Sequence, residues 1–145
     1  MINVRLSWPE TMHPRPSVLI VDDEVNVART LRMIFENEGY EVATASSCAD
    51  ALQEIANGHN YDAVITDLNM EKPDVGLQVA RAAKKLQSRP VVVICTGYAS
   101  TSNSAAALDM HVDYLATKPV QLDELISALN RLLARRRDTG TKNGR

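Results

Sequence analysis

The chain has 145 residues, of which 45% are hydrophobic and 23% charged, and its formal net charge is −2. This length corresponds to about one domain, and the composition is that of a globular protein rather than a disordered chain. A net charge near zero supplies no basic field for nucleic acid or for an anionic membrane surface. No apolar run exceeds Val91–Cys95, which is too short for a membrane span. We therefore expect a cytoplasmic single domain that binds neither nucleic acid nor membrane.

Residues 1–16 show no helical or strand period and are predicted to form an extended leader. Beyond them, short apolar runs typical of buried strands alternate with segments whose apolar residues recur at helical spacing. The predicted strands are Val18–Val21, Val42–Ala45, Ala63–Thr66, Val91–Cys95 and Tyr114–Thr117. The predicted helical stripes are Val27–Phe35, Ala51–Ala56, Val79–Leu86, Ser102–Asp109 and Leu122–Leu133.

Residues that begin or end helices support this division. Gly39 follows the first stripe as a stop signal, and Ser47 with Asp50 three residues later predicts the start of the second helix. Arg135–Arg137 closes the last helix, at the end where cations favour the helix dipole. The folded domain is accordingly expected over 17–135, with a polar tail over 136–145.

Five strand–helix units with short connections predict an α/β fold, in which helices cover both faces of a parallel sheet. A doubly wound sheet of five strands fits the flavodoxin-like order 2-1-3-4-5, which binds ligands beyond the carboxyl ends of its first and third strands. Polar residues follow four of the predicted strands: Asp22, Asp23 and Glu24, then Asp67, then Thr96, then Lys118.

Clustered carboxylates repel one another unless a cation neutralises them, and Mg²⁺ prefers such oxygen ligands. Ionised Asp22, Asp23 and Asp67 carry three negative charges, which Mg²⁺ and Lys118 would balance. Such a site could accept a phosphoryl group, with the ion, Lys118 and the Thr96 hydroxyl each binding one phosphoryl oxygen. A carboxylate can itself be the nucleophile, and Asp67 is the better candidate because it stands alone on its strand.

These residues carry a resemblance to a known family. VDDE at 21–24, Asp67 after AVIT, Thr96 after VVVIC and KP at 118–119 together resemble the receiver domain of bacterial response regulators. Each motif is weak alone, but their order, each at the end of a strand, is specific. The resemblance covers residues 17 to about 135 and implies a stand-alone phosphoacceptor switch of a two-component phosphorelay.

The resemblance implies that Asp67 accepts a phosphoryl group from a sensor histidine kinase or a phosphotransfer protein. It implies a Mg²⁺ ion held by Asp23, Asp67 and the backbone carbonyl of Asn69, with Asp22 helping through water. The remaining implied roles are phosphoryl binding and switching by Thr96 and Lys118, open access at Gly97, and tuning of the hydrolysis rate by Asn69 and Tyr98. Slow self-dephosphorylation is the most catalysis that such a protein would perform.

Two features depart from the family pattern. The family usually has proline four residues after the phosphoacceptor, where this chain has Glu71, and the loop up to Gly76 is one residue longer. The switch aromatic usually lies three residues before the lysine, where this chain has Leu115. Tyr114 would face the other side of the strand. Either a local shift restores Tyr114 as the switch residue, or the protein signals without the usual coupling between threonine and tyrosine.

We expect output through protein contact, on the face formed by the helix over 102–109, the strand over 114–117 and the last helix. Dimerisation remains open. One alternative is a receiver-like scaffold that works without phosphorylation, which the altered loop and Leu115 would suit. The other is an aspartate-nucleophile phosphohydrolase of the haloacid-dehalogenase type. That class needs a second acid two residues beyond the nucleophile, where this chain has Asn69.

Overall fold

The structure is a computed structural model. It describes residues 15–97 and 101–143, except for the side chains of residues 101–104 and 137–143. Most of the predicted leader, and Tyr98, lie outside the described residues. The strands are β1 (Ser17–Val21), β2 (Glu41–Ala45), β3 (Ala63–Asp67), β4 (Val91–Thr96) and β5 (Tyr114–Thr117). The helices are α1 (Val25–Asn37), α2 (Cys48–Ala56), α3 (Gly76–Lys84), α4 (Thr101–Asp109) and α5 (Leu122–Asn143).

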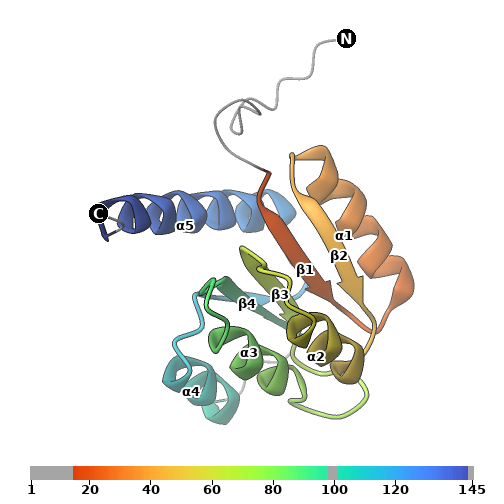
Figure 1. Ribbon diagram of the computed structural model, residues 1–145. Coiled ribbons are helices and arrows are strands. Elements are labelled where there is room, and N and C mark those ends of the chain that lie inside the picture. The colour runs from red at the N-terminus through yellow and green to blue at the C-terminus, as the bar shows by residue number, and fades with distance from the viewer. Residues whose placement is uncertain (1–14, 98–100, 144–145) are drawn as a thin grey trace.

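All neighbouring strands are parallel, and their order is β2-β1-β3-β4-β5. The predicted flavodoxin-like order is therefore confirmed (Figure 1). Every residue of β3 and β4 is buried, because these strands lie inside the sheet and have helices over both faces. β2 and β5 form the two edges of the sheet and are more exposed.

Two hydrophobic clusters hold the helices on the sheet. One contains apolar residues of α2, α3 and α4, among them Ile55, Val79 and Ala107, together with one face of the strands. The other joins Phe35 of α1 and Leu129 of α5 to the opposite face. The side chains of β1, β3 and β4 alternate between the two clusters, as the period of two requires.

The predicted helix starts and stops are largely confirmed. The Ser47 hydroxyl accepts a hydrogen bond from the Asp50 amide at 3.0 Å and so caps α2. Gly39 has a φ of 100°, a conformation that favours glycine just after a helix. The predicted end of the last helix is wrong, because α5 continues through Asn143.

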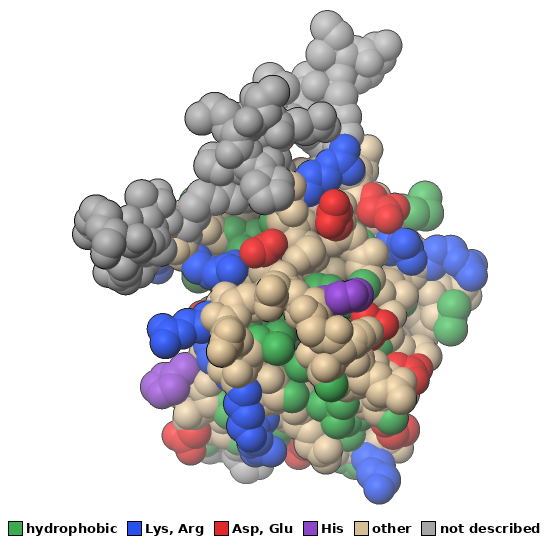
Figure 2. Space-filling view, viewed as in Figure 1, with side chains coloured by type: hydrophobic (Ala, Val, Ile, Leu, Met, Phe, Trp, Pro, Cys, Tyr) green, Lys and Arg blue, Asp and Glu red, His purple; other side chains and the backbone are tan. Residues whose placement is uncertain are grey.

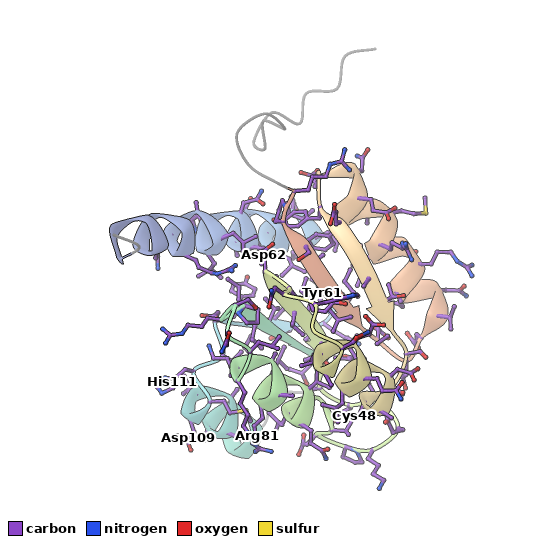
Figure 3. All side chains as sticks on the ribbon, viewed as in Figure 1. Cys48, Tyr61, Asp62, Arg81, Asp109 and His111 are labelled. Atoms are coloured by element: carbon purple, nitrogen blue, oxygen red, sulfur yellow. The ribbon has the colours of Figure 1, made fainter. Side chains whose placement is uncertain are left out.

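Arg136, in the arginine run of α5, links this helix to the sheet. Its guanidinium donates hydrogen bonds to the carbonyl oxygens of Asp62 and Ser88, both at 3.0 Å, and to the Asp62 carboxylate at 3.2 Å. Asp62 also accepts a hydrogen bond from the Ser17 amide at 2.8 Å. Figure 3 shows Asp62 at the start of β3, beside α5. These contacts anchor α5 to the amino end of the sheet, so the arginine is a structural link rather than a solvated terminus.

Acidic and basic side chains are interspersed over the face drawn in Figure 2, among the residues that the structure describes. Over the same residues, no helix has both the length and the apolar character needed to cross a bilayer.

Candidate functional site

Three aspartates from two strand ends lie together at the carboxyl edge of the sheet. Asp22 and Asp23 follow β1, Asp67 ends β3, and one carboxylate oxygen of each lies within 4.8 Å of the others. Asp22 and Asp67 are buried, whereas Asp23 is exposed. The Asp22 amide donates to the Ala45 carbonyl at 3.1 Å, extending the ladder between β1 and β2. The ladder thus fixes the backbone that carries the acidic pair.

Lys118 reaches this cluster from the end of β5. Its backbone amide donates to the Thr96 carbonyl at 2.8 Å, which joins the ends of β4 and β5. Its Nζ atom lies 2.8 Å from Asp67 Oδ1, and the lysine side chain is 37% exposed against 8% for Asp67. The expected convergence of Asp22, Asp23, Asp67 and Lys118 is therefore what the structure shows.

The environment of the cluster shifts the pKa values of its members. Burial raises the pKa of Asp67, and Lys118 only partly opposes this effect. Burial also raises the pKa of Asp22, which accepts the Glu24 amide at 2.9 Å. Burial alone would lower the pKa of Lys118, but its hydrogen bond and charge interaction with Asp67 raise it. Ionised carboxylates are therefore held at a cost to stability, which a bound cation would relieve.

We expect Asp22→Asn to stabilise the fold at pH 7 without divalent cations. The raised pKa of Asp22 means that the native state binds its proton more tightly than the unfolded chain, so stability falls as pH rises through that pKa. Removing the charge should add about 1 kcal/mol, or about 3–5 °C in Tm for a domain of this size. Thermal unfolding in a chelator measures the change.

Two comparisons check this result. The gain should vanish at about pH 3, where Asp22 is protonated in both the native and the unfolded states. Asp23→Asn is the matched control, and its smaller gain follows from the exposure of Asp23. An equal gain at acidic and neutral pH would contradict the electrostatic explanation.

The loop between β3 and α3 is closed on itself by hydrogen bonds. The Asn69 side-chain oxygen accepts the Asp74 amide at 2.7 Å, and the Gly76 amide donates to the Leu68 carbonyl at 2.7 Å. Asp74 has a φ of 61°, a left-handed conformation that aspartate tolerates better than most residues. The Asn69 side chain thus supports the loop, a role that the sequence did not indicate.

Gly76 begins α3 directly against the backbone of the candidate phosphoacceptor. A Cβ atom at this position would lie 2.0 Å from the Asp67 carbonyl oxygen and 2.8 Å from the Leu68 Cα atom. Only glycine permits this approach. The sequence identified Gly76 simply as the end of a loop, because a close contact between backbones leaves no periodic signal.

Glu71 connects the same loop to α2. Its carboxylate accepts a hydrogen bond from the Cys48 amide, with distances of 3.1 and 3.5 Å to the two oxygens. Cys48 is the first residue of α2 (Figure 3), where an anion also interacts favourably with the helix dipole. The residue that replaces the usual proline is therefore a helix cap provided by another segment of the chain.

Glu71→Gln and Glu71→Ala separate the charge of this cap from its hydrogen bond. We expect glutamine to lose a few tenths of a kcal/mol of unfolding free energy and alanine about 1 kcal/mol. Denaturant unfolding measures both losses. Lys72→Ala, in the same exposed loop, is the control. A loss for Lys72→Ala as large as that for Glu71→Ala would mean that the contact with Cys48 is not responsible.

The structure separates Tyr114 from Thr96. Tyr114 packs with the α1 and α5 cluster, while Leu115 pairs with Ile94 and shares the face of Ile94 and Thr96. No register shift brings Tyr114 to the Thr96 face, so the first of the two alternatives for the switch aromatic is wrong in this structure. Thr96 is buried at the end of β4, and a Cβ at Gly97 would meet no atom within 4 Å.

Comparison with known families agrees with this geometry. Residues 18–130 match the family model of the response regulator receiver domain. The chain belongs to this family. Receiver domains are the phosphoacceptor domains of two-component response regulators, so the chain is a receiver domain of this class.

Relatives and solved structures give the same assignment. The response regulator ArlR of Staphylococcus aureus is 35% identical over 118 residues, which are 81% of this chain and 52% of that protein. The chain thus spans about half the length of the curated relatives it matches. A CheY-like receiver domain protein from Methanospirillum hungatei has a TM-score of 0.80 at 28% identity, covering 87% of this chain and 99% of that one. The response regulator TrrA of Thermotoga maritima, solved in complex with Mg²⁺-BeF, has a TM-score of 0.69 at 30% identity, covering 81% and 98%.

Proposed function

We propose that this receiver domain is a phosphorylation switch in which Asp67 accepts a phosphoryl group from a phosphohistidine. The observation that carries the proposal is the cluster of Asp22, Asp23 and Asp67, with the Lys118 ammonium 2.8 Å from Asp67. The donor is a sensor histidine kinase or a phosphotransfer protein. A carboxylate oxygen of Asp67 bonds to phosphorus as the phosphorus–nitrogen bond breaks, and the leaving imidazole takes up a proton.

The donor set fits a Mg²⁺ ion. Three carboxylates within 4.8 Å of one another offer the hard oxygen ligands that this ion prefers, and exposed Asp23 leaves room for its waters. Asp23, Asp67 and the Asn69 backbone carbonyl would hold the ion, with Asp22 acting through water. When bound, the ion supplies positive charge that stabilises the phosphoryl oxygens.

Lys118 and Thr96 have complementary roles in the proposed switch. The Lys118 ammonium pairs with the Asp67 carboxylate in the structure. Once Asp67 is phosphorylated, the same ammonium can bind a phosphoryl oxygen instead. The Thr96 hydroxyl, at the end of β4, binds a second phosphoryl oxygen. Gly97, which has no side chain, leaves the path to the phosphoryl group open. The phosphoryl group on Asp67 shifts an existing equilibrium between two conformations of the domain, to the extent that it interacts better with one of them.

Output is proposed to pass through the face formed by α4, β5 and α5. Leu108 on α4 is 74% exposed and Leu115 on β5 is 36% exposed, so the face presents apolar groups to a protein partner. Because Leu115 lies on the Thr96 face, we propose that movement of Thr96 is transmitted through a leucine and not through the usual aromatic residue. The partner is a protein or a second copy of this chain.

The proposal predicts covalent labelling at one residue. Incubation with Mg²⁺ and acetyl phosphate should form an adduct that hydroxylamine removes, and intact-mass measurement should show one added phosphoryl group. Asp67→Asn should abolish the adduct, and chelation of Mg²⁺ should prevent it in the parent. Labelling that persists in Asp67→Asn would overturn the assignment of the acceptor.

A further inference from the structure

The outer edge of β2 has backbone groups that no described residue binds. β2 pairs only with β1 within the described part of the chain. The Glu41 amide donates to the Pro16 carbonyl, and the Ala45 carbonyl accepts the Asp22 amide, so these residues direct their backbone groups toward β1. In a parallel ladder, alternate residues bond to opposite sides. Val42 and Thr44 therefore direct their amides and carbonyls outward, where no described residue bonds to them.

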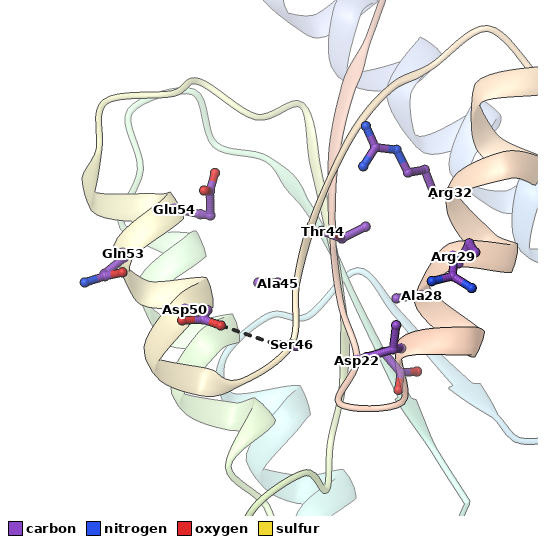
Figure 4. A pocket seen from close by; sticks show the side chains of 11 residues that line it. Asp22, Ala28, Arg29, Arg32, Thr44, Ala45, Ser46, Asp50, Gln53 and Glu54 are labelled. Carbon is purple, nitrogen blue, oxygen red and sulfur yellow. Dashed lines mark hydrogen bonds between the residues drawn. The ribbon is translucent and has the colours of Figure 1, made fainter.

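The Thr44 end of this edge forms the floor of a groove between α1 and α2, which we call the β2 groove. A cavity of about 480 Å³ is lined by Arg29 and Arg32 of α1, by Thr44 of β2, and by Asp50 and Glu54 of α2. Figure 4 shows Arg29 and Arg32 on one side of the strand and Asp50 and Glu54 on the other. Asp22 also lines the cavity, on the arginine side. Apart from Asp22 at one end, the groove therefore has a basic wall on α1 and an acidic wall on α2.

The side chains of the basic wall are available to a ligand. Arg29 is exposed and has no hydrogen-bond or ion-pair partner among the described residues. Arg32 pairs with Glu36 at 3.1 Å, and both side chains are about half exposed. Exposed pairs of this kind are worth little and exchange readily for another anion. On the opposite wall, Asp50 is exposed, and among the described residues its carboxylate accepts only the Ser46 hydroxyl, at 3.2 Å.

We propose that the β2 groove binds an extended peptide segment of another protein as a sixth strand. A strand added to the edge lies about 4.8 Å from β2, and its side chains point alternately toward α1 and α2. Residues that face α1 meet Arg29 and Arg32, and residues that face α2 meet Asp50 and Glu54. The groove therefore selects a segment in which acidic and basic residues alternate. This inference does not depend on phosphorylation of Asp67.

The charges argue against a second copy of this chain as the occupant. Two β2 edges joined antiparallel about a two-fold axis keep α1 of both copies on the same face of the joined sheet. Arg29 and Arg32 would then face the same arginines, and Asp50 would face Asp50. Like charges opposite one another destabilise strand pairing. A heterologous peptide avoids this repulsion.

A synthetic peptide of four Glu-Lys repeats, blocked at both ends, tests the proposal at low salt. We expect it to slow hydrogen exchange of the Val42 and Thr44 amides and leave that of Ala43 unchanged, because Ala43 already faces β1. A peptide of the same composition with Glu-Glu-Lys-Lys order cannot place all its acids on one face. It should bind about tenfold more weakly by fluorescence anisotropy.

Charge reversal supplies the second arm. Arg29→Glu with Arg32→Glu should weaken binding of the alternating peptide by tenfold or more, whereas Arg81→Glu on α3 should not change it. The reversed residues are exposed, so the fold should be retained, which circular dichroism checks. Equal affinity for the two peptides, or binding without protection of Val42 and Thr44, would overturn the proposal. So would unchanged binding by the reversed variant.

Discussion

Gly76→Ala is expected to destabilise the protein by about 3 kcal/mol or more and to disturb the acidic cluster. The added Cβ would lie 2.0 Å from the Asp67 carbonyl oxygen, so either α3 or the end of β3 must move. Overpacking that forces backbone shifts costs about 1–3 kcal/mol or more, and neither backbone can move cheaply because β3 is buried throughout. Denaturant unfolding should show a lower midpoint, and Mg²⁺ titration should show weaker binding.

Gly97→Ala is the matched control, because a Cβ there meets no atom within 4 Å. Its unfolding free energy should stay within about 0.5 kcal/mol of the parent. Equal losses for the two variants would show that removal of glycine, and not the contact with Asp67, determines the effect.

Lys118→Met is expected to change phosphorylation and ion binding in opposite directions. Losing the ammonium removes a group that would stabilise the phosphoryl oxygens, so the labelling rate by acetyl phosphate should fall by about 100-fold or more. The same substitution leaves Asp67 without the cation that lies 2.8 Å away. Mg²⁺ then no longer competes with an internal cation, and its affinity should rise.

Mg²⁺ affinity by calorimetry and the labelling rate by mass spectrometry give the two measurements. Lys84→Met is the control, because it also removes a half-buried ammonium, one that pairs with Asp113 at 3.7 Å. It should leave both quantities unchanged. Weaker Mg²⁺ binding in Lys118→Met would contradict the proposed competition between lysine and ion.

Most of the architecture could be predicted because the two sequence patterns that indicate it are local: apolar runs for buried strands and apolar residues at helical spacing for helices. Apolar runs such as Val91–Cys95 are buried on both faces of the sheet, and the stripe of α5 packs through Leu125, Leu129 and Leu133. The parallel order then placed the acids at one edge without any further assumption. Asp22, Asp23 and Asp67 meet there because each follows or ends a strand.

The remaining features depend on contacts between segments distant in sequence, which composition and periodicity do not record. Glu71 caps α2, which begins 23 residues earlier in the chain. Gly76 touches the backbone of Asp67, and Arg136 binds Asp62 across 74 residues. The face taken by Tyr114 could be settled only by the pairing of β5 with β4.

The Arg136 link also determines where the domain can be shortened. A chain cut after residue 135, at the boundary suggested by composition, would keep the apolar stripe of α5 but lose the cation beside Asp62. The Asp62 carbonyl would keep only the Val91 amide, at 2.9 Å, the Ser88 carbonyl would have to find water as its partner, and the carboxylate that bonds to Ser17 would lose its counter-charge. Truncation for crystallisation or for fusion to another protein should therefore retain at least one turn beyond Arg136.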